Sequence, residues 1–367
     1  MLNDPFETLK KYINSPSGSH DKADVELTAA IIAEDFKALG FNVEVHPGKE
    51  YGPTLVCSIG SGSKTLMLMG HMDTVFPHVV YVPYTPQPDG KIKGSGIIDM
   101  KGGIMVMLYA LKEALPKIDL NKYTIKAVLN PDEEAGSDES REYILGTAQT
   151  AFAALSFEPM GAGGRLTCAR KGVTSVFIEC TGVPGHAGAE YTKCHSAIEA
   201  LCKQLSKLYT LRDDSREISF NAGLISGGTA ENVVAPYASC KCEVRYFNMA
   251  YREPLLSKIK ELTSEEPVPG AHTKVTFGPS HPAVDDTPAS LALAQKAIAI
   301  GKTQGRSLFS EKTGGAGDIS IAAQTGVPVL DGLGLYGGSY HTIDEYCLKE
   351  AVPNQIELAQ KLISELC

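Results

Sequence analysis

The sequence predicts an α/β protein whose chain is interrupted by an α+β domain. Strand-like and helix-like stretches alternate through residues 1–167, and the same alternation resumes before the C-terminus, within 282–367. Residues 168–281 instead read as strand, helix, strand, strand, helix and strand, a pattern typical of helices on one face of an antiparallel sheet. At 367 residues the chain is too long for one ordinary hydrophobic core. We therefore expect a first domain at 1–167 and 282–367 and an inserted domain at 168–281.

The bulk composition argues against several classes of protein. A formal net charge of -9, without any cluster of lysine and arginine, disfavours a nucleic-acid-binding protein. The N-terminal stretch MLNDPFETLKKY lacks the apolar core of a secretory signal, and no segment approaches the roughly 18 apolar residues of a membrane span. The nine cysteines are scattered without a C-x-x-C motif, so we expect reduced thiols. These features indicate a cytoplasmic protein that binds no membrane.

The first elements follow from hydrophobic periodicity. Apolar residues recur at spacings of three and four through 22–39, which predicts a helix, and Gly40 follows as its stop signal. Strand-like runs follow at 42–46, 54–59 and 65–69. In the last run the four residues Leu66 to Met69 are all apolar, as expected for a strand that is buried on both faces of a covered sheet.

Two glycine-rich segments resemble nucleotide-binding loops but fail their patterns. GSGSKT at 60–65 has Ser63 where a phosphate loop has glycine, and a strand follows it, so we interpret it as a hairpin turn. GSGIIDMKGG at 94–103 has Asp99 where the dinucleotide fingerprint needs its last glycine. The glycines instead allow the backbone to pack tightly around one carboxylate, and a helix is expected over 104–115.

Ionisable side chains cluster where several predicted strands end. His71 and Asp73 follow the run at 65–69, and their spacing of two directs both side chains the same way. Imidazole is a common metal ligand, and a neighbouring carboxylate can orient it, although such a pair taken alone is more often a capping aspartate beside a surface histidine. Open α/β sheets place their sites at the carboxyl ends of strands. The pair is therefore a candidate metal site.

Two more predicted strands end in acidic residues. The strand at 123–130 runs into PDEEAGS, which contains Glu133 and Glu134, and the strand in AFAALSFEP ends at Glu158. Adjacent carboxylates repel one another and need a cation, a shared proton or solvent to lie together. An acidic surface turn is the alternative for each segment taken alone, but their repetition after His71 favours a shared cation site.

These motifs together resemble the M20 family of co-catalytic zinc peptidases, in its glutamate carboxypeptidase-like branch. The matching segments follow the family's order along nearly the whole chain: GHMDTV, GSGIIDMKGG, PDEEAGS, SFEP, GVPGHAG, ISGGTAENVV, TGGAGDIS and GGSYHTIDEY. The resemblance implies a zinc-peptidase-like α/β catalytic domain with a mixed central sheet and an inserted α+β lid and dimerisation domain. It also implies hydrolysis of a peptide or N-acyl amide bond that releases a C-terminal amino acid, with a glutamate-like residue expected.

The resemblance also implies roles for individual residues. It implies two Zn²⁺ per subunit, with Co²⁺ or Mn²⁺ as substitutes, held by His71, Asp99 and Glu158 and by Asp99, Glu134 and His341. Asp99 would bridge the two ions, and the peptide bond between Asp99 and Met100 is expected to be cis. Glu133 would act as the general base, and Asp73 would orient His71.

The inserted domain is expected to supply substrate contacts. The resemblance implies that His186 reaches across a homodimer to the partner's active site, where it stabilises the tetrahedral oxyanion. Asn232, Arg245 and Arg165 correspond to polar positions that contact substrate in the family, although Arg245 could instead pair with Glu243.

A histidine replaces a cationic residue at one position of the inserted domain. His281 stands where some glutamate-releasing relatives have arginine, and a mostly neutral histidine would weaken the grip on a carboxylate. The preference for glutamate therefore depends on this position.

Two other functions remain open on the motifs alone. An N-acyl amino acid deacylase, or aminoacylase, or a small-peptide dipeptidase would use the same metals and differ only in its substrate pocket. A catalytically inactive zinc-binding scaffold would be expected to lack one of Glu133, His71 or His341, all of which are present. The expected partners are therefore a small peptide or N-acyl amino acid and a second copy of the chain.

Overall fold

The computed structural model describes residues 4–367, which form two compact units. The first unit contains the chain through Ala169 together with Asp286–Thr313 and Gly317–Cys367. The second unit contains Arg170–Asp285 and the short segment Gly314–Ala316. The chain therefore leaves the first unit after Ala169 and returns to it at Asp286.

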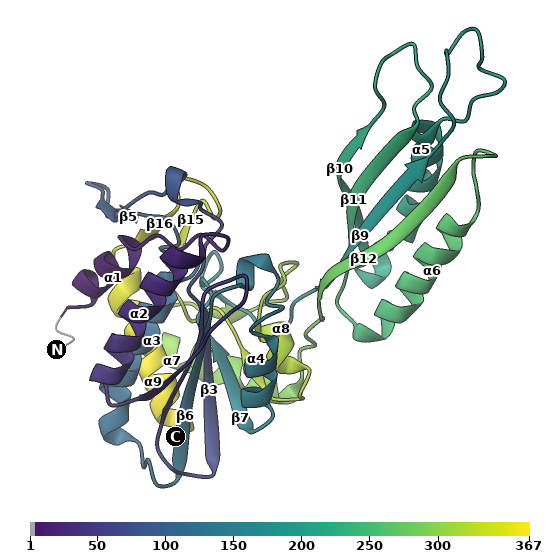
Figure 1. The fold of residues 1–367 in the computed structure, drawn as a ribbon. Helices are drawn as coiled ribbons and strands as arrows, with labels where there is room; N and C mark the ends of the chain where they lie inside the picture. Colours follow the sequence, from purple (N-terminus) through teal and green to yellow (C-terminus); the bar gives the residue numbers. More distant parts are fainter. Residues whose placement is uncertain (1–3) are drawn as a thin grey trace. The chain divides into compact units, whose positions relative to one another are not determined.

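A six-stranded mixed sheet forms the centre of the first unit (Figure 1). Its strands are, in spatial order, β1 (Asn42–His46), β2 (Thr54–Ile59), β6 (Tyr123–Asn130), β3 (Lys64–His71), β7 (Ala151–Ser156) and β14 (Val329–Leu330). The pairs β1/β2 and β2/β6 are antiparallel, whereas β6, β3, β7 and β14 run parallel to one another. The predicted mixed sheet is confirmed.

Helices cover both faces of this sheet. They are α1 (Pro5–Ile13), α2 (Lys22–Ala38), α3 (Lys101–Ala114), α4 (Arg141–Ala148), α7 (Pro288–Thr303), α8 (Ile319–Ala323) and α9 (Ala351–Leu366). Leu66 and Leu68 of β3 belong to the main apolar core with α3 and α9, while the alternate residues Met67 and Met69 are buried toward the opposite face. Helices α4 and α8 pack on that opposite face (Figure 1).

Short strands complete the first unit. A small sheet has the order β15 (Gly337–Gly338), β16 (Tyr346–Leu348), β5 (Lys91–Lys93) and β4 (Thr85–Pro86). Strands β8 (Arg165–Leu166) and β13 (Phe309–Ser310) form a separate parallel pair. The small sheet connects the segment before Asp99 to the segment after His341.

The second unit is an antiparallel sheet with its helices on one face (Figure 1). The strands lie in the order β10 (Ser219–Gly227), β11 (Tyr237–Tyr246), β9 (Gly172–Thr181) and β12 (His272–His281). Helices α5 (Ala197–Leu208) and α6 (Arg252–Ser264) share a separate apolar core with these strands. Buried residues alternate along β9, as expected for a sheet that is covered on one face.

Three local expectations were wrong. Strand β3 continues through Gly70 to His71, because these residues pair with Leu129 and Asn130 of β6. Residues 60–65 do not form a hairpin, because β6 lies between β2 and β3. Helix α3 begins at Lys101, three residues before the expected start.

Two expectations from composition concern membranes and cysteines. Among residues 4–367 no helix is long and apolar enough to cross a lipid bilayer, and residues 1–3 of the N-terminal stretch lie outside the described chain. All nine cysteines, which lie within the described residues, are free thiols. The thiol of Cys242 donates a hydrogen bond to Sγ of Cys240 at 3.3 Å in the core of the second unit, with no disulfide between the two.

Candidate metal centre and active site

Three adjacent parallel strands deliver the candidate site residues to one edge of the central sheet. His71 is the last residue of β3, Glu133 and Glu134 follow β6 in the short helical turn η3 (Glu133–Ala135), and Glu158 follows β7 by two residues. Because β6, β3 and β7 are parallel neighbours, their carboxyl ends coincide. Asp99, just before α3, and His341, between β15 and β16, reach the same edge from loops.

Asp99 lies between two groups of potential ligands. Its Oδ1 is 3.2 Å from Nε2 of His71, and its Oδ2 is 3.2 Å from Nε2 of His341. The His71 Nε2 atom is also 3.6 Å from Oε1 of Glu158, and the His341 Nε2 atom is 3.6 Å from Oε2 of Glu134. One carboxylate therefore offers a separate oxygen to each histidine.

These separations fit metal coordination. Ligand atoms at about 2.0 to 2.2 Å from a tetrahedral zinc ion lie about 3.3 to 3.6 Å from one another. The 3.2 and 3.6 Å separations of the two groups match that spacing. Oε1 of Glu134 is buried and has no hydrogen-bond partner among residues 4–367, which leaves an oxygen for a cation. Both groups can therefore hold a divalent ion.

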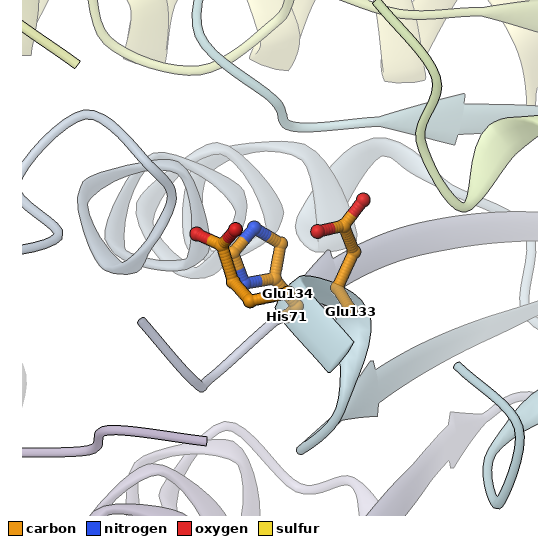
Figure 2. Close-up of side chains that lie close together, drawn as sticks. All are labelled: His71, Glu133 and Glu134. Atoms are coloured by element: carbon orange, nitrogen blue, oxygen red, sulfur yellow. The ribbon is translucent and has the colours of Figure 1, made fainter. Parts of the chain in front are cut away.

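Glu133 and Glu134 approach His71 from one short turn. Figure 2 shows their carboxylates directed to different sides of the imidazole. One oxygen of each carboxylate and one ring nitrogen of His71 lie within 4.8 Å of one another. Glu134 alone belongs to the group that contains Asp99 and His341, so Glu133 remains near the two groups without belonging to either of those two ligand sets.

Asp73 forms contacts with several residues at this edge of the sheet. It is fully buried, and its Oδ1 lies 3.3 Å from Nδ1 of His71. Its two carboxylate oxygens accept the backbone N–H groups of Glu133 and Glu134, each at 3.2 Å. The hydroxyl of Ser19 donates to Oδ2 at 2.7 Å. The aspartate thus links β3, the η3 turn and the N-terminal segment.

The clustering of carboxyl groups shifts the pKa values of the site residues. Burial and the nearby carboxylate of Asp99 raise the pKa of Glu134 to about 7, and burial also raises the pKa of Glu133 well above its usual range. The hydrogen bond to Asp99 raises the pKa of His341 to about 9, despite partial burial. Burial opposes ionisation of Asp99, but its hydrogen bonds with His341 and His71 lower the pKa of that carboxyl. A bound dication would offset this charge.

The sequence analysis missed a buried polar cluster under the η3 turn. Asp318 accepts a hydrogen bond from Nδ2 of Asn130 at 2.5 Å, and its other oxygen accepts one from the hydroxyl of Ser137. Ser137 itself has a positive φ of 57°, so the turn after Glu134 is tightly constrained. Burial raises the pKa of Asp318 to about 6. Asp318 lies in the motif TGGAGDIS, which was its only signal in the sequence.

The expected substrate residues lie in both units. Arg165 belongs to β8 of the first unit, and its Nη1 is 3.8 Å from Oε2 of Glu311. In the second unit, Asn232 is exposed in the loop between β10 and β11, and His281 ends β12 opposite Val173.

Arg245 adopts the alternative arrangement considered from the sequence. Its Nε and Nη2 atoms donate to Glu243 at 2.8 and 3.0 Å, and Nη1 donates to the carbonyl oxygen of Gly314 at 2.7 Å. Its guanidinium is therefore already engaged in this conformation.

His186 lies in an exposed turn of the second unit. Its Nδ1 atom accepts the backbone N–H groups of Gly188 and Ala189 at 3.1 and 3.2 Å. In the neutral ring these contacts assign the proton to Nε2. His186 is therefore arranged to donate a hydrogen bond from Nε2.

The expected cis peptide bond between Asp99 and Met100 is present, and it is the only non-proline cis bond among residues 4–367. The bond immediately precedes α3, which begins at Lys101. The expectation based on the family resemblance is confirmed.

The edge of this covered α/β sheet gathers two histidines and three carboxylates, an arrangement suited to the metal chemistry of a hydrolase. The sequence profile described as peptidase family M20/M25/M40 matches residues 67–365. Carboxypeptidase G2 from Pseudomonas sp. (strain RS-16) is 32% identical over 370 residues, covering 98% of this chain and 89% of that protein. The chain belongs to peptidase family M20/M25/M40 and is a metallopeptidase.

Solved structures share its fold. The M20 family metallo-carboxypeptidase Sso-CP2 from Sulfolobus solfataricus has a TM-score of 0.80 at 16% identity, with 99% of each chain covered. Aminopeptidase PepT from Bacillus cereus ATCC 10987 has a TM-score of 0.79 at 24% identity, with 99% of this chain and 98% of that chain covered. The predicted fold class is confirmed.

Proposed function

We propose that the protein is a dizinc carboxypeptidase that hydrolyses a peptide or N-acyl amide bond and releases a glutamate-like C-terminal amino acid. The observation that carries this proposal is the position of Asp99, whose two oxygens each lie 3.2 Å from a different histidine. A shared carboxylate between two ligand groups suits a two-metal hydrolase. The likeness to carboxypeptidase G2 supports the release of a C-terminal residue.

The proposed ligands divide into two sets that share one member. The sets are His71, Asp99 and Glu158 for one ion and Asp99, Glu134 and His341 for the other. Imidazole and carboxylate ligands suit zinc, and Co²⁺ or Mn²⁺ are accepted by the same donors. When bound, the two ions supply Lewis acidity, which lowers the pKa of water and polarises the scissile carbonyl.

Glu133 is the proposed general base. It lies beside the two ligand sets without belonging to them, so its carboxylate stays available to take a proton from the attacking water. The same carboxyl then returns the proton to the leaving amine. Asp73 holds the backbone of Glu133 and the ring of His71, so the base and the ligand share one support.

His186 is the proposed oxyanion donor, acting on the active site of a partner subunit in a homodimer. The contacts of Gly188 and Ala189 with Nδ1 leave the Nε2 proton free to donate to developing negative charge. The inserted unit therefore acts as a lid and dimerisation domain in this proposal.

Substrate recognition is assigned to Asn232, Arg245, Arg165 and His281. Arginine forms two parallel hydrogen bonds with carboxylates, which suits a C-terminal carboxylate and an acidic side chain. Because Arg245 is paired with Glu243, substrate binding through its guanidinium requires an exchange of that carboxylate for the substrate's. Arg165, whose contact with Glu311 is longer at 3.8 Å, needs no such exchange.

A panel of substrates tests the proposal. Peptides and N-acyl amino acids that end in Glu, Asp, Ala, Leu or Arg are incubated with zinc-loaded and with chelated enzyme. We expect chelator-sensitive release that is fastest for Glu. Faster release of a neutral residue from N-acyl substrates, or cleavage of dipeptides alone, would replace the glutamate assignment with a deacylase or dipeptidase. Two bound ions without any turnover would instead favour a zinc-binding scaffold.

A further inference from the structure

A buried glutamate outside the ligand sets holds the backbone of Asp99. The carboxylate of Glu345, which is only 1% exposed, accepts the N–H groups of Ile98 and Asp99 at 2.9 and 3.2 Å through Oε1. Its Oε2 accepts the N–H group of Gly96 at 3.0 Å. The backbone oxygen of Glu345 also accepts the N–H of Gly94 at 3.1 Å, so one residue fastens the whole segment 94–99.

We propose that Glu345 is a positioning residue, which fixes Asp99 so that each of its oxygens faces a different histidine. The inference rests on the proposed two-metal function, because it concerns the carboxylate that both ions would share. Glu345 itself touches no reacting atom. Its effect would pass through the backbone of Asp99 to both ligand sets.

Three N–H groups converge on the side chain of Glu345. Two oxygens of a carboxylate can accept from all three donors, whereas a glutamine would direct an NH₂ group at one or more of them. The buried amino group of Lys101 donates to the carbonyl oxygen of Ser15 and to the hydroxyl of Tyr81. Glu345 is therefore the side-chain acceptor for all three N–H groups of the segment.

The backbone around Asp99 is closely packed against neighbouring residues. A Cβ atom at Gly96, whose φ is 70°, would lie 2.5 Å from Cγ2 of Thr74. A Cβ atom at Gly94 would lie 2.4 Å from Cγ2 of Ile13. The backbone is thus packed against neighbours on one side and held by Glu345 on the other, so loss of the glutamate would displace Asp99.

Glu345 also connects Asp99 to the other loop ligand. His341 is four residues earlier in the same loop, and the adjacent Asp344 pairs with Lys93 at 2.7 Å. Tyr346 of β16 pairs with Lys93 of β5, directly before the segment that contains Asp99. The bridging carboxylate and the histidine of the second set are therefore held by one connected structure.

The test compares Glu345→Gln with Glu350→Gln, which changes an exposed glutamate nearby. Zinc affinity is measured by chelator competition. The values of kcat and KM are measured on the best substrate of the panel, and the melting temperature is measured on metal-free protein. For Glu345→Gln we expect zinc binding and kcat to fall about 10- to 100-fold, while KM stays close to the wild-type value. Glu350→Gln should match the wild type throughout.

The outcomes separate the inference from the proposed function. Unchanged zinc affinity and kcat in Glu345→Gln overturn the positioning role, while a wild type that binds fewer than two zinc ions overturns the two-metal proposal. A lower melting temperature with unchanged zinc affinity and kcat assigns Glu345 a purely structural role. If Glu345→Gln does not fold, the same measurements are made on Glu345→Asp. This variant keeps the carboxyl group, but its side chain is shorter and is expected to lose the hydrogen bond with the backbone N–H of Asp99.

Discussion

The carboxylate of Asp73 lies 3.3 Å from Nδ1 of His71 and accepts the backbone N–H groups of both Glu133 and Glu134. One buried side chain thus holds the proposed ligands His71 and Glu134 and the proposed base Glu133. Asp73→Asn replaces one acceptor with an NH₂ group, so we expect zinc affinity or kcat to fall about 10- to 100-fold. Chelator competition and steady-state kinetics measure both. An Asp138→Asn variant, altered at an exposed aspartate, should behave like the wild type.

The role of Glu133 is tested by Glu133→Gln. The substitution keeps the shape of the side chain but removes its ability to take a proton, so kcat should fall at least about 100-fold. Zinc content should remain at the wild-type level, because Glu133 lies outside both ligand sets. Glu142→Gln, at an exposed position eight residues away from Glu134, is the matched control. Full activity in Glu133→Gln would remove the residue from the mechanism.

Metal removal should destabilise the protein as well as inactivate it. Without cations, the carboxylates of Asp99, Glu134 and Glu158 face one another at one edge of the sheet. Zinc at 100 times its dissociation constant adds about 2.7 kcal/mol per site to the free energy of unfolding. Melting temperatures with and without zinc measure this effect. His341→Gln should lose part of the shift, and His272→Gln, changed at an exposed histidine, should keep all of it.

The buried carboxyl of Asp318 should make stability depend on pH. Burial raises its pKa from 3.8 to about 6, so the folded chain keeps a proton that the unfolded chain loses between these values. Its contribution to stability is therefore present below 3.8 and is lost as the pH rises through about 6. Two pKa units correspond to at most about 3 kcal/mol.

Asp318→Asn removes that titration. Denaturant unfolding of the metal-free protein, followed from about pH 4 to pH 7, should show a smaller loss of stability with rising pH in Asp318→Asn than in the wild type. Asp138→Asn, at an exposed site, should follow the wild-type profile. Identical profiles for Asp318→Asn and the wild type would show that Asp318 does not titrate in this range.

The proposed homodimer is tested at the edge strand β10. Leu224 and Ile225 are each 65% exposed on this strand, which has a sheet partner on one side only. Ile225→Lys should shift the protein from dimer to monomer in light scattering, because a buried lysine would be costly in the interface. Val79→Lys places the same charge at a 90% exposed valine of the first unit and should leave the dimer intact. A monomeric wild type would contradict the proposal.

Local sequence patterns predicted the bounds of several strands correctly. The predicted bounds of the strands at 42–46, 54–59 and 123–130 agree with β1, β2 and β6, because each is a short run rich in strand-forming residues with turn residues near its ends. The expected hairpin at 60–65 failed because strand order depends on pairing with β6, which lies far along the chain. Strand β3 extends beyond the predicted run at 65–69 through Gly70, where a Cβ atom would lie 2.9 Å from Cε of Met100, so this glycine allows close packing.

The sequence alone determined which imidazoles and carboxylates are candidates for the site, through its motifs and their order along the chain. Only the tertiary structure decided that Asp99 presents one oxygen to His71 and the other to His341. Only the tertiary structure revealed Glu345, whose bonds to the Asp99 segment join residues almost 250 positions apart. Local motifs identify which residues are candidate ligands. The distances between these residues arise instead from hydrogen bonds and packing among segments that lie far apart in the sequence.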